Sequence, residues 1–114
     1  MEVKEQHLLI YETDDGKSPF EEWIDKLRDS QVRRRIFARL ARVRAGNFGD
    51  SSPVGEGVLE LRFHFGSGFR VYFGRDGERI VVLLAGGDKS TQTKDIEDAK
   101  NYWKAYLEKK DANT

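Results

Sequence analysis

Residues 58–73 read Val-Leu-Glu-Leu-Arg-Phe-His-Phe-Gly-Ser-Gly-Phe-Arg-Val-Tyr-Phe, and this stretch decides the predicted fold. Apolar side chains alternate with polar ones on both sides of a Gly-Ser-Gly turn, which is the pattern of two half-buried strands. The stretch therefore predicts an antiparallel β-hairpin. Placing Phe63 opposite Val71 keeps the apolar side chains on one face and makes 66–68 a three-residue loop.

The other face of this hairpin carries polar side chains. The same register pairs His64 with Arg70 and Arg62 with Tyr72, with Glu60 beyond them. RNA can be cut without a metal ion when its own 2′-hydroxyl attacks the adjacent phosphate, a reaction that needs a base, an acid and cations. Arg62 and Arg70 can bind the phosphate. His64 or Glu60 can move protons, and Tyr72 can stack on a base. The alternative is an ordinary solvated sheet face, whose cross-strand pairs contribute about 0.2–1 kcal/mol each.

Outward from the hairpin, the pattern predicts helices and two further strands. Ser18 is a suitable N-cap, Pro19 fits the first helical position, and Glu21 completes a capping box. Apolar residues at helical spacing predict helices from Ser18 to about Leu27, from about Gln31 to Ala45, and after the loop 86–91. The further strands are expected at 7–11 and 80–85, the second covered on both faces. The Gly-rich segment 46–57 is interpreted as a loop.

The predicted order is strand, two helices, three antiparallel strands and a helix, which is typical of a compact, single-domain α+β protein. With 114 residues, the chain has room for one hydrophobic core. We expect the domain to span 1–108 and the polar tail 109–114 to be frayed.

Composition excludes several classes of protein. The chain has no cysteine and two histidines, so we expect no disulfide, no metal site and no cofactor. Its longest apolar run is 80–85, far too short for a membrane-spanning helix. Residues 1–6 are charged and lack the hydrophobic stretch of a signal peptide, so a cytoplasmic location is expected.

Charge is unevenly distributed along the chain, although the net charge is zero. From Ser30 to Gly49 there are six arginines and no acidic residue. The expected inward stripe of the second helix leaves four of them toward its flanks or outside: Arg34, Arg35, Arg39 and Arg42. Because such a patch attracts anions, we interpret these arginines as RNA-binding; the alternative is a solvated helix face.

Lys89 lies just before the last helix, where free amides and the helix dipole favour an anion. Ordinary capping by Ser90 or Thr91, with Lys89 merely exposed, is the alternative. We therefore keep Lys89 as a further candidate for binding phosphate.

Five segments, taken together and in order, are similar to a known family. They are Ser-Pro-Phe-Glu-Glu-Trp (18–23), Gly-Asn-Phe-Gly-Asp (46–50), Val-Leu-Glu-Leu-Arg (58–62), Gly-Ser-Gly-Phe-Arg-Val-Tyr-Phe (66–73) and Gly-Gly-Asp-Lys-Ser-Thr-Gln (86–92). These segments resemble the RelE/ParE toxin superfamily, above all its HigB-like branch of phage-related addiction module killer proteins. The resemblance covers roughly residues 8–104 and implies a RelE-like fold.

The resemblance implies the toxin of a type II toxin–antitoxin pair, with a helix-turn-helix antitoxin as its partner. RelE-type and HigB-type members cleave mRNA on the ribosome, whereas ParE-type members poison DNA gyrase. The leading expectation is a metal-independent, ribosome-dependent mRNA endonuclease that inhibits translation. A gyrase-binding module without enzymatic activity and a decayed toxin that binds only its antitoxin are the alternatives.

Three positions match basic residues of the family. Arg70 matches the arginine of the Gly-aromatic-Arg turn, Arg62 the strand arginine of the Leu-Arg step, and Lys89 the basic residue before the last helix. The polar face of the hairpin and the loop before the last helix point to the same three residues.

Two positions depart from the family pattern. Glu60 stands where RelE has a lysine, and the tyrosine early in the last segment of RelE has no equivalent, since the next tyrosine after Lys89 is Tyr102. Either another residue such as His64 moves the protons, or the activity is weak or directed at another target.

Overall fold

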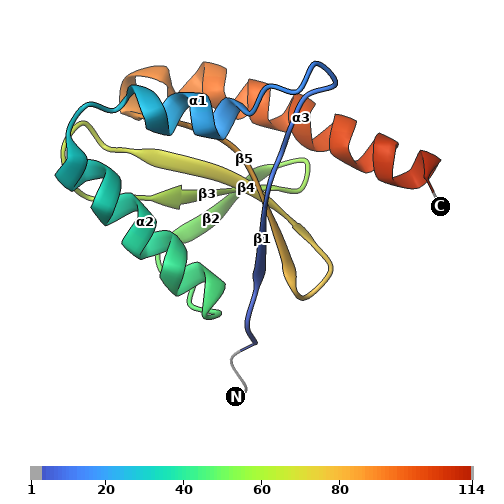
Figure 1. Ribbon diagram of the computed structural model, residues 1–114, viewed down its shortest axis with the longest axis horizontal. Coiled ribbons are helices and arrows are strands. Elements are labelled where there is room, and N and C mark those ends of the chain that lie inside the picture. Colours follow the sequence, from blue (N-terminus) through green and yellow to red (C-terminus); the bar gives the residue numbers. More distant parts are fainter. Residues whose placement is uncertain (1–3, 114) are drawn as a thin grey trace.

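A five-stranded sheet in the order β1–β5–β4–β3–β2 lies at the centre of the computed structural model, which describes residues 4–113 (Figure 1). Strand β1 runs parallel to β5, and the other neighbouring strands are antiparallel. The elements are β1 (His7–Ile10), α1 (Pro19–Lys26), α2 (Ser30–Arg44), β2 (Ser51–Gly55), β3 (Val58–Arg62), β4 (Arg70–Asp76), β5 (Ile80–Gly87), the 3-10 turn η1 (Lys89–Thr91) and α3 (Gln92–Ala112). The α+β class and the expected order of elements are confirmed, and β2 is added to them.

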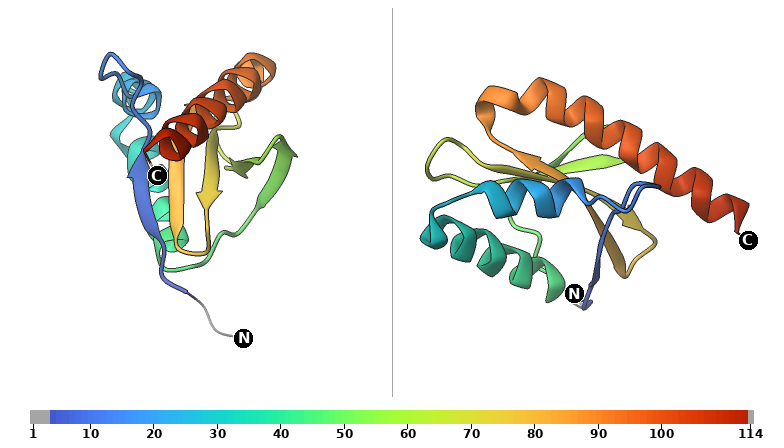
Figure 2. Two further views of the ribbon diagram at one scale, coloured as in Figure 1. Left: turned by 90° about the vertical axis from the view of Figure 1, so that its right-hand side faces the viewer. Right: turned by 45° about the horizontal axis from the view of Figure 1, so that its top comes forward.

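Helices cover both faces of the sheet (Figures 1 and 2). On one face, Phe20 of α1 and Ile36 of α2 belong to the same buried cluster as Val81 of β5. On the other face, Trp103 of α3 belongs to a second buried cluster with Val82. Successive residues of β5 thus enter opposite cores, as expected for an apolar run covered on both faces.

Local sequence signals determine where the first two helices begin. The Ser18 hydroxyl accepts a hydrogen bond from the Glu21 amide at 3.2 Å, and Pro19 occupies the first helical position. The Asp29 carboxylate accepts from the Gln31 amide at 2.9 Å and caps α2, which starts at Ser30. Capping of this kind satisfies amides that have no partner inside the helix.

Two strand glycines allow indole rings to lie directly on the sheet backbone. A Cβ atom at Gly74 would lie 2.4 Å from the ring of Trp103, and one at Gly86 would lie 2.1 Å from the ring of Trp23. Both distances are far below a carbon–carbon contact, so any side chain would push the helices off the sheet.

Strand β2 corrects the expectation that 46–57 is a loop. Ser51–Gly55 pairs antiparallel with β3, with a bulge between Pro53 and Gly55. The segment has no apolar alternation of its own, and within residues 4–113 it is an edge strand that pairs with β3 alone. Its strand conformation comes from pairing with β3, which local sequence does not encode.

The expected register of the hairpin is also wrong, by two residues. Arg62 pairs with Arg70 and Glu60 with Tyr72, and the amide of Phe63 donates to the carbonyl of Phe69 at 3.0 Å. The loop is therefore 64–68 instead of 66–68. A shift of two residues leaves every side chain on the same face, so alternation alone cannot distinguish the two registers.

Helix α3 continues past residue 108, where fraying was expected, and ends at Ala112. Asp76 at the end of β4 holds this part, because it accepts a hydrogen bond from Tyr106 at 2.7 Å and forms an ion pair with Lys110. Thr114, the end of the expected tail, lies outside the described residues, as do residues 1–3 of the expected domain. No helix within residues 4–113 is long and apolar enough to span a bilayer.

Candidate functional site

The three predicted phosphate-binding cations lie at one end of the sheet. Arg62 and Arg70 lie directly opposite each other on β3 and β4. The Lys89 amide donates to the carbonyl of Ser67 at 3.4 Å, which places the start of η1 beside the hairpin loop. A Cβ atom at Gly68 would lie 3.3 Å from the Lys89 Cβ atom and 3.8 Å from Nη1 of Arg70. The absence of a side chain at Gly68 therefore lets Arg70 and Lys89 approach each other.

Asp50 connects two of the predicted catalytic residues. Its Oδ1 atom accepts hydrogen bonds from Arg62 at 2.9 Å and 3.3 Å, and its Oδ2 atom pairs with Nε2 of His64. The hydrogen bonds from His64 and Arg62 lower the pKa of the Asp50 carboxyl below its ordinary value. The imidazole is 74% exposed, and its Nδ1 atom has no hydrogen-bond partner among the described residues. This is an aspartate-oriented histidine beside an arginine.

Glu60 lies beneath this surface, where it is 3% exposed. Gln92, the first residue of α3, donates to its Oε2 atom at 2.8 Å, and Nε of Arg70 lies 3.6 Å from its Oε1 atom. The start of α3 thus closes over a part of the sheet that the hairpin pattern alone leaves open. A carboxylate in this position holds Arg70 and has little access to a substrate.

Tyr72 is fully buried beside Glu60. Burial and the neighbouring carboxylate raise the pKa of its hydroxyl above the ordinary value. No hydrogen-bond partner for this hydroxyl satisfies normal geometry within the described part of the chain. Its ring packs in the core under α3, so the structure gives it no exposed face for stacking on a base.

Arg39 clamps the segment that carries Asp50. Its Nη1 atom donates to the carbonyl of Arg62 at 2.8 Å, and its Nη2 atom donates to the carbonyls of Phe48 and Asp50 at 3.4 Å and 3.3 Å. Burial lowers the pKa of this guanidinium below its ordinary value. Arg39 therefore holds the loop before β2 against the end of β3, which fixes Asp50 next to its partners.

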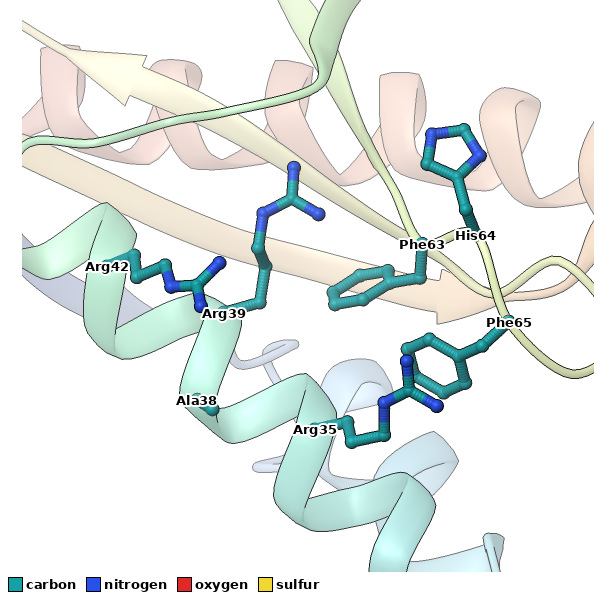
Figure 3. Close-up of a pocket in the computed structure, with 7 residues that line it drawn as sticks. All are labelled: Arg35, Ala38, Arg39, Arg42, Phe63, His64 and Phe65. Carbon is teal, nitrogen blue, oxygen red and sulfur yellow. The ribbon is translucent and has the colours of Figure 1, made fainter.

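A cavity of about 280 Å³ lies between α2 and the end of β3 (Figure 3). It is lined by Arg35, Ala38, Arg39, Arg42, Phe63, His64 and Phe65. The guanidinium carbon of Arg35 lies 3.8 Å from the ring centre of Phe65, and that of Arg39 lies 5.3 Å from the ring centre of Phe63. Three of the four predicted RNA-binding arginines thus share one cavity. Arg34 is exposed on α2 and does not line it.

Asp50 and Gln92 are the contributors that sequence reasoning missed. Asp50 closes the Gly-Asn-Phe-Gly-Asp segment, whose role was interpreted as ending a helix and forming a loop. The only signal for Asp50 in the sequence was that it is an acidic residue at the end of a basic region. Among residues 4–113, no group of three or more His, Asp or Glu side chains is placed to hold a metal ion.

The chain matches known proteins over most of its length. Residues 22–104 match the family described as "Phage derived protein Gp49-like (DUF891)". An uncharacterized protein of Haemophilus influenzae (strain ATCC 51907 / DSM 11121 / KW20 / Rd) is 47% identical over 81 residues, which cover 71% of this chain and 82% of that protein. The matched region includes every predicted site residue. The chain therefore belongs to the phage-derived Gp49-like family, a toxin-like family related to the RelE/ParE toxins.

Proposed function

We propose that this protein is the toxin of a type II toxin–antitoxin pair, of the HigB-like kind, and that it cleaves mRNA on the ribosome without a metal ion. The observation that carries the proposal is the end of the sheet where Arg62, Arg70 and Lys89 meet beside the pair formed by Asp50 and His64. Family membership supports the toxin class and an antitoxin partner.

The chemistry assigned to this site is attack by the 2′-hydroxyl on the adjacent phosphorus. Nδ1 of His64 accepts the hydroxyl proton, while Asp50 orients the ring and offsets the charge that it gains. Arg62 and Arg70 neutralise the charge that develops on the phosphate oxygens.

The 5′-oxygen then leaves and takes up a proton, and the products are a 2′,3′-cyclic phosphate and a 5′-hydroxyl. Of the three clustered cations, Lys89 is the one able to give up a proton, because a guanidinium stays protonated in proteins. We therefore assign protonation of the leaving oxygen to Lys89. We assign base catalysis to His64 in preference to Glu60, which is buried and held by Gln92.

The exposed arginines of α2 extend the cationic surface beyond the reacting groups. Arg34 is exposed on this helix and does not line the cavity. We assign it to contact with ribosomal RNA, where each phosphate contact adds salt-dependent affinity.

The test uses purified protein and ribosomes programmed with a defined mRNA. Wild-type protein and the control Arg79→Gln are expected to cut within codons and to leave 2′,3′-cyclic phosphate ends. Arg79 is exposed and lies before β5, at the opposite end of the sheet from Arg70. His64→Gln is expected to reduce cleavage at least a hundredfold, in the range of a lost general base.

The same proteins are tested for inhibition of DNA supercoiling by gyrase. Inhibition of gyrase without cleavage of mRNA would overturn the proposal in favour of a ParE-like binding module. Binding of the antitoxin with neither effect would identify a decayed toxin.

A further inference from the structure

The cavity between α2 and the end of β3 is separate from the cluster of Arg62, Arg70 and Lys89, but it adjoins that cluster through His64. We propose that this cavity binds one nucleotide of the RNA substrate, the nucleotide next to the phosphate that is cut. The inference rests on the proposed function, since the strand in the cavity is the strand that is cleaved. The sequence predicts only that the arginines of α2 bind RNA. This inference makes the arginines of the cavity contacts of the RNA substrate itself.

The shape and lining of the cavity suit a single nucleotide. Its volume of about 280 Å³ lies just below the range of roughly 300–1,000 Å³ for small-molecule sites, so it has room for no more than one nucleotide and for no folded RNA. Phe63 and Phe65 line its floor, and their rings point toward α2 (Figure 3). Phe63 is 3% exposed and belongs to the core, so the half-buried Phe65 is the ring that lies within reach of a ligand. Among the described residues, no carboxylate lines the cavity. Aromatic rings beside cations are the combination that binds unpaired bases and their phosphates.

Two of the three arginines in the cavity have free donors. The guanidinium of Arg39 donates hydrogen bonds to backbone carbonyls, so this side chain forms a fixed wall of the cavity. Within residues 4–113, the guanidinium groups of Arg35 and Arg42 have no hydrogen-bond or ion-pair partner. Arg35 is an exposed residue whose guanidinium has one face on the ring of Phe65 and the other face turned away from that ring. A base can stack on that face while Arg42 binds the phosphate.

The position of His64 connects the cavity to the reacting groups. Its backbone lies between the two phenylalanines, but its imidazole is turned away from their rings (Figure 3) and pairs with Asp50. Asp50 in turn holds Arg62. The cavity lies on the α2 face of the sheet and Arg62 and Arg70 lie on the α3 face, so a strand that leaves the cavity passes around the end of β3, at His64, before it reaches these arginines.

Binding is tested by NMR titration of the full chain with adenosine 5′-monophosphate, with adenosine and with inorganic phosphate. We expect the monophosphate to shift the signals of Phe65 and His64 and to bind more tightly than either fragment. Arg35→Gln is expected to weaken this binding about tenfold, the effect of losing the guanidinium face on which the base stacks. The control Arg79→Gln removes an exposed charge elsewhere and is expected to bind as wild type does. Equal binding of phosphate and of the nucleotide would overturn the inference.

Cleavage separates this inference from the proposed function. Arg35→Gln and Phe65→Leu are expected to cut programmed mRNA with an altered preference for the base beside the cut, and an NMR spectrum of each variant checks its fold. If folded variants cut the same positions at the same rate as wild type, the nucleotide pocket is wrong and the proposed function stands. If the monophosphate binds but wild-type protein cuts no RNA, the proposed function fails and the cavity is a nucleotide site of another kind.

Discussion

Replacing Arg70 by alanine is expected to damage both activity and stability, through two different contacts. The activity loss comes from the missing phosphate contact. Removing one charge-assisted donor from a site of this kind costs about 2.7–4 kcal/mol of transition-state stabilisation, or roughly a hundred- to a thousandfold in rate. Cleavage of programmed mRNA by the variant measures this loss.

The stability loss comes from Glu60, which loses its cation in the variant. Nε of Arg70 lies 3.6 Å from the carboxylate, and the two side chains are 13% and 3% exposed. At an effective dielectric constant of about 20, two unit charges at this distance attract by about 5 kcal/mol. Breaking one partner of a buried pair typically costs about 3–5 kcal/mol. Since Gln92 still donates to Glu60, we expect the lower end, a fall in Tm of roughly 10–15 °C.

A second substitution separates the two effects. In Glu60→Gln/Arg70→Ala, the buried charge is gone while the neutral amide can keep its contact with Gln92. Chemical denaturation should therefore show that at least half of the lost free energy of unfolding returns, whereas cleavage stays lost. If the double variant unfolds as easily as Arg70→Ala, the unpaired carboxylate is not the cause. If it cleaves like wild type, Arg70 has no role at the phosphate.

Four further outcomes are expected. Asp50→Asn should reduce cleavage about tenfold or more, because His64 and Arg62 lose the carboxylate that orients them; unchanged cleavage would exclude the positioning role. Since folding lowers the pKa of Asp50, its contribution to stability is present at neutral pH and is lost as the pH falls below about 4, so the Tm difference between wild type and Asp50→Asn should shrink in that range. Gly74→Ala should lower the free energy of unfolding by about 1–3 kcal/mol in urea, because the added Cβ would overlap the ring of Trp103, and a variant as stable as wild type would show that the helix moves freely. Cleavage should continue in EDTA under conditions that keep the ribosome intact. Loss of cleavage in EDTA that returns when magnesium is added back would reveal a metal requirement.

Much of this fold could be predicted because its signals are local. The Ser-Pro start of α1 caps the helix with its own side chain, and Ile36 and Leu40 of α2 are buried as their helical spacing predicts. The apolar run in β5 is buried on both faces. Each of these features depends on residues within one or two turns of each other, so the sequence pattern and the structure agree.

The candidate site was predicted in part, for the same reason. Alternation placed Arg62 and Arg70 on one face, and a register error of two residues does not move a side chain to the other face. The loop before the last helix pointed to Lys89, whose approach to Arg70 depends on the small residue at Gly68. These are features of composition and period, which are present in the sequence itself.

The sequence alone thus determined the α+β order, the helix starts and the sign of charge at the site. Only the tertiary structure decided the pairing of β2, the hairpin register, the burial of Glu60 under α3 and the placement of Asp50 beside His64. The physical reason is distance along the chain: Glu60 meets Gln92, and Asp50 is clamped by Arg39, only after separate elements have packed together. Contacts of that kind depend on the whole assembly, and no local pattern records them.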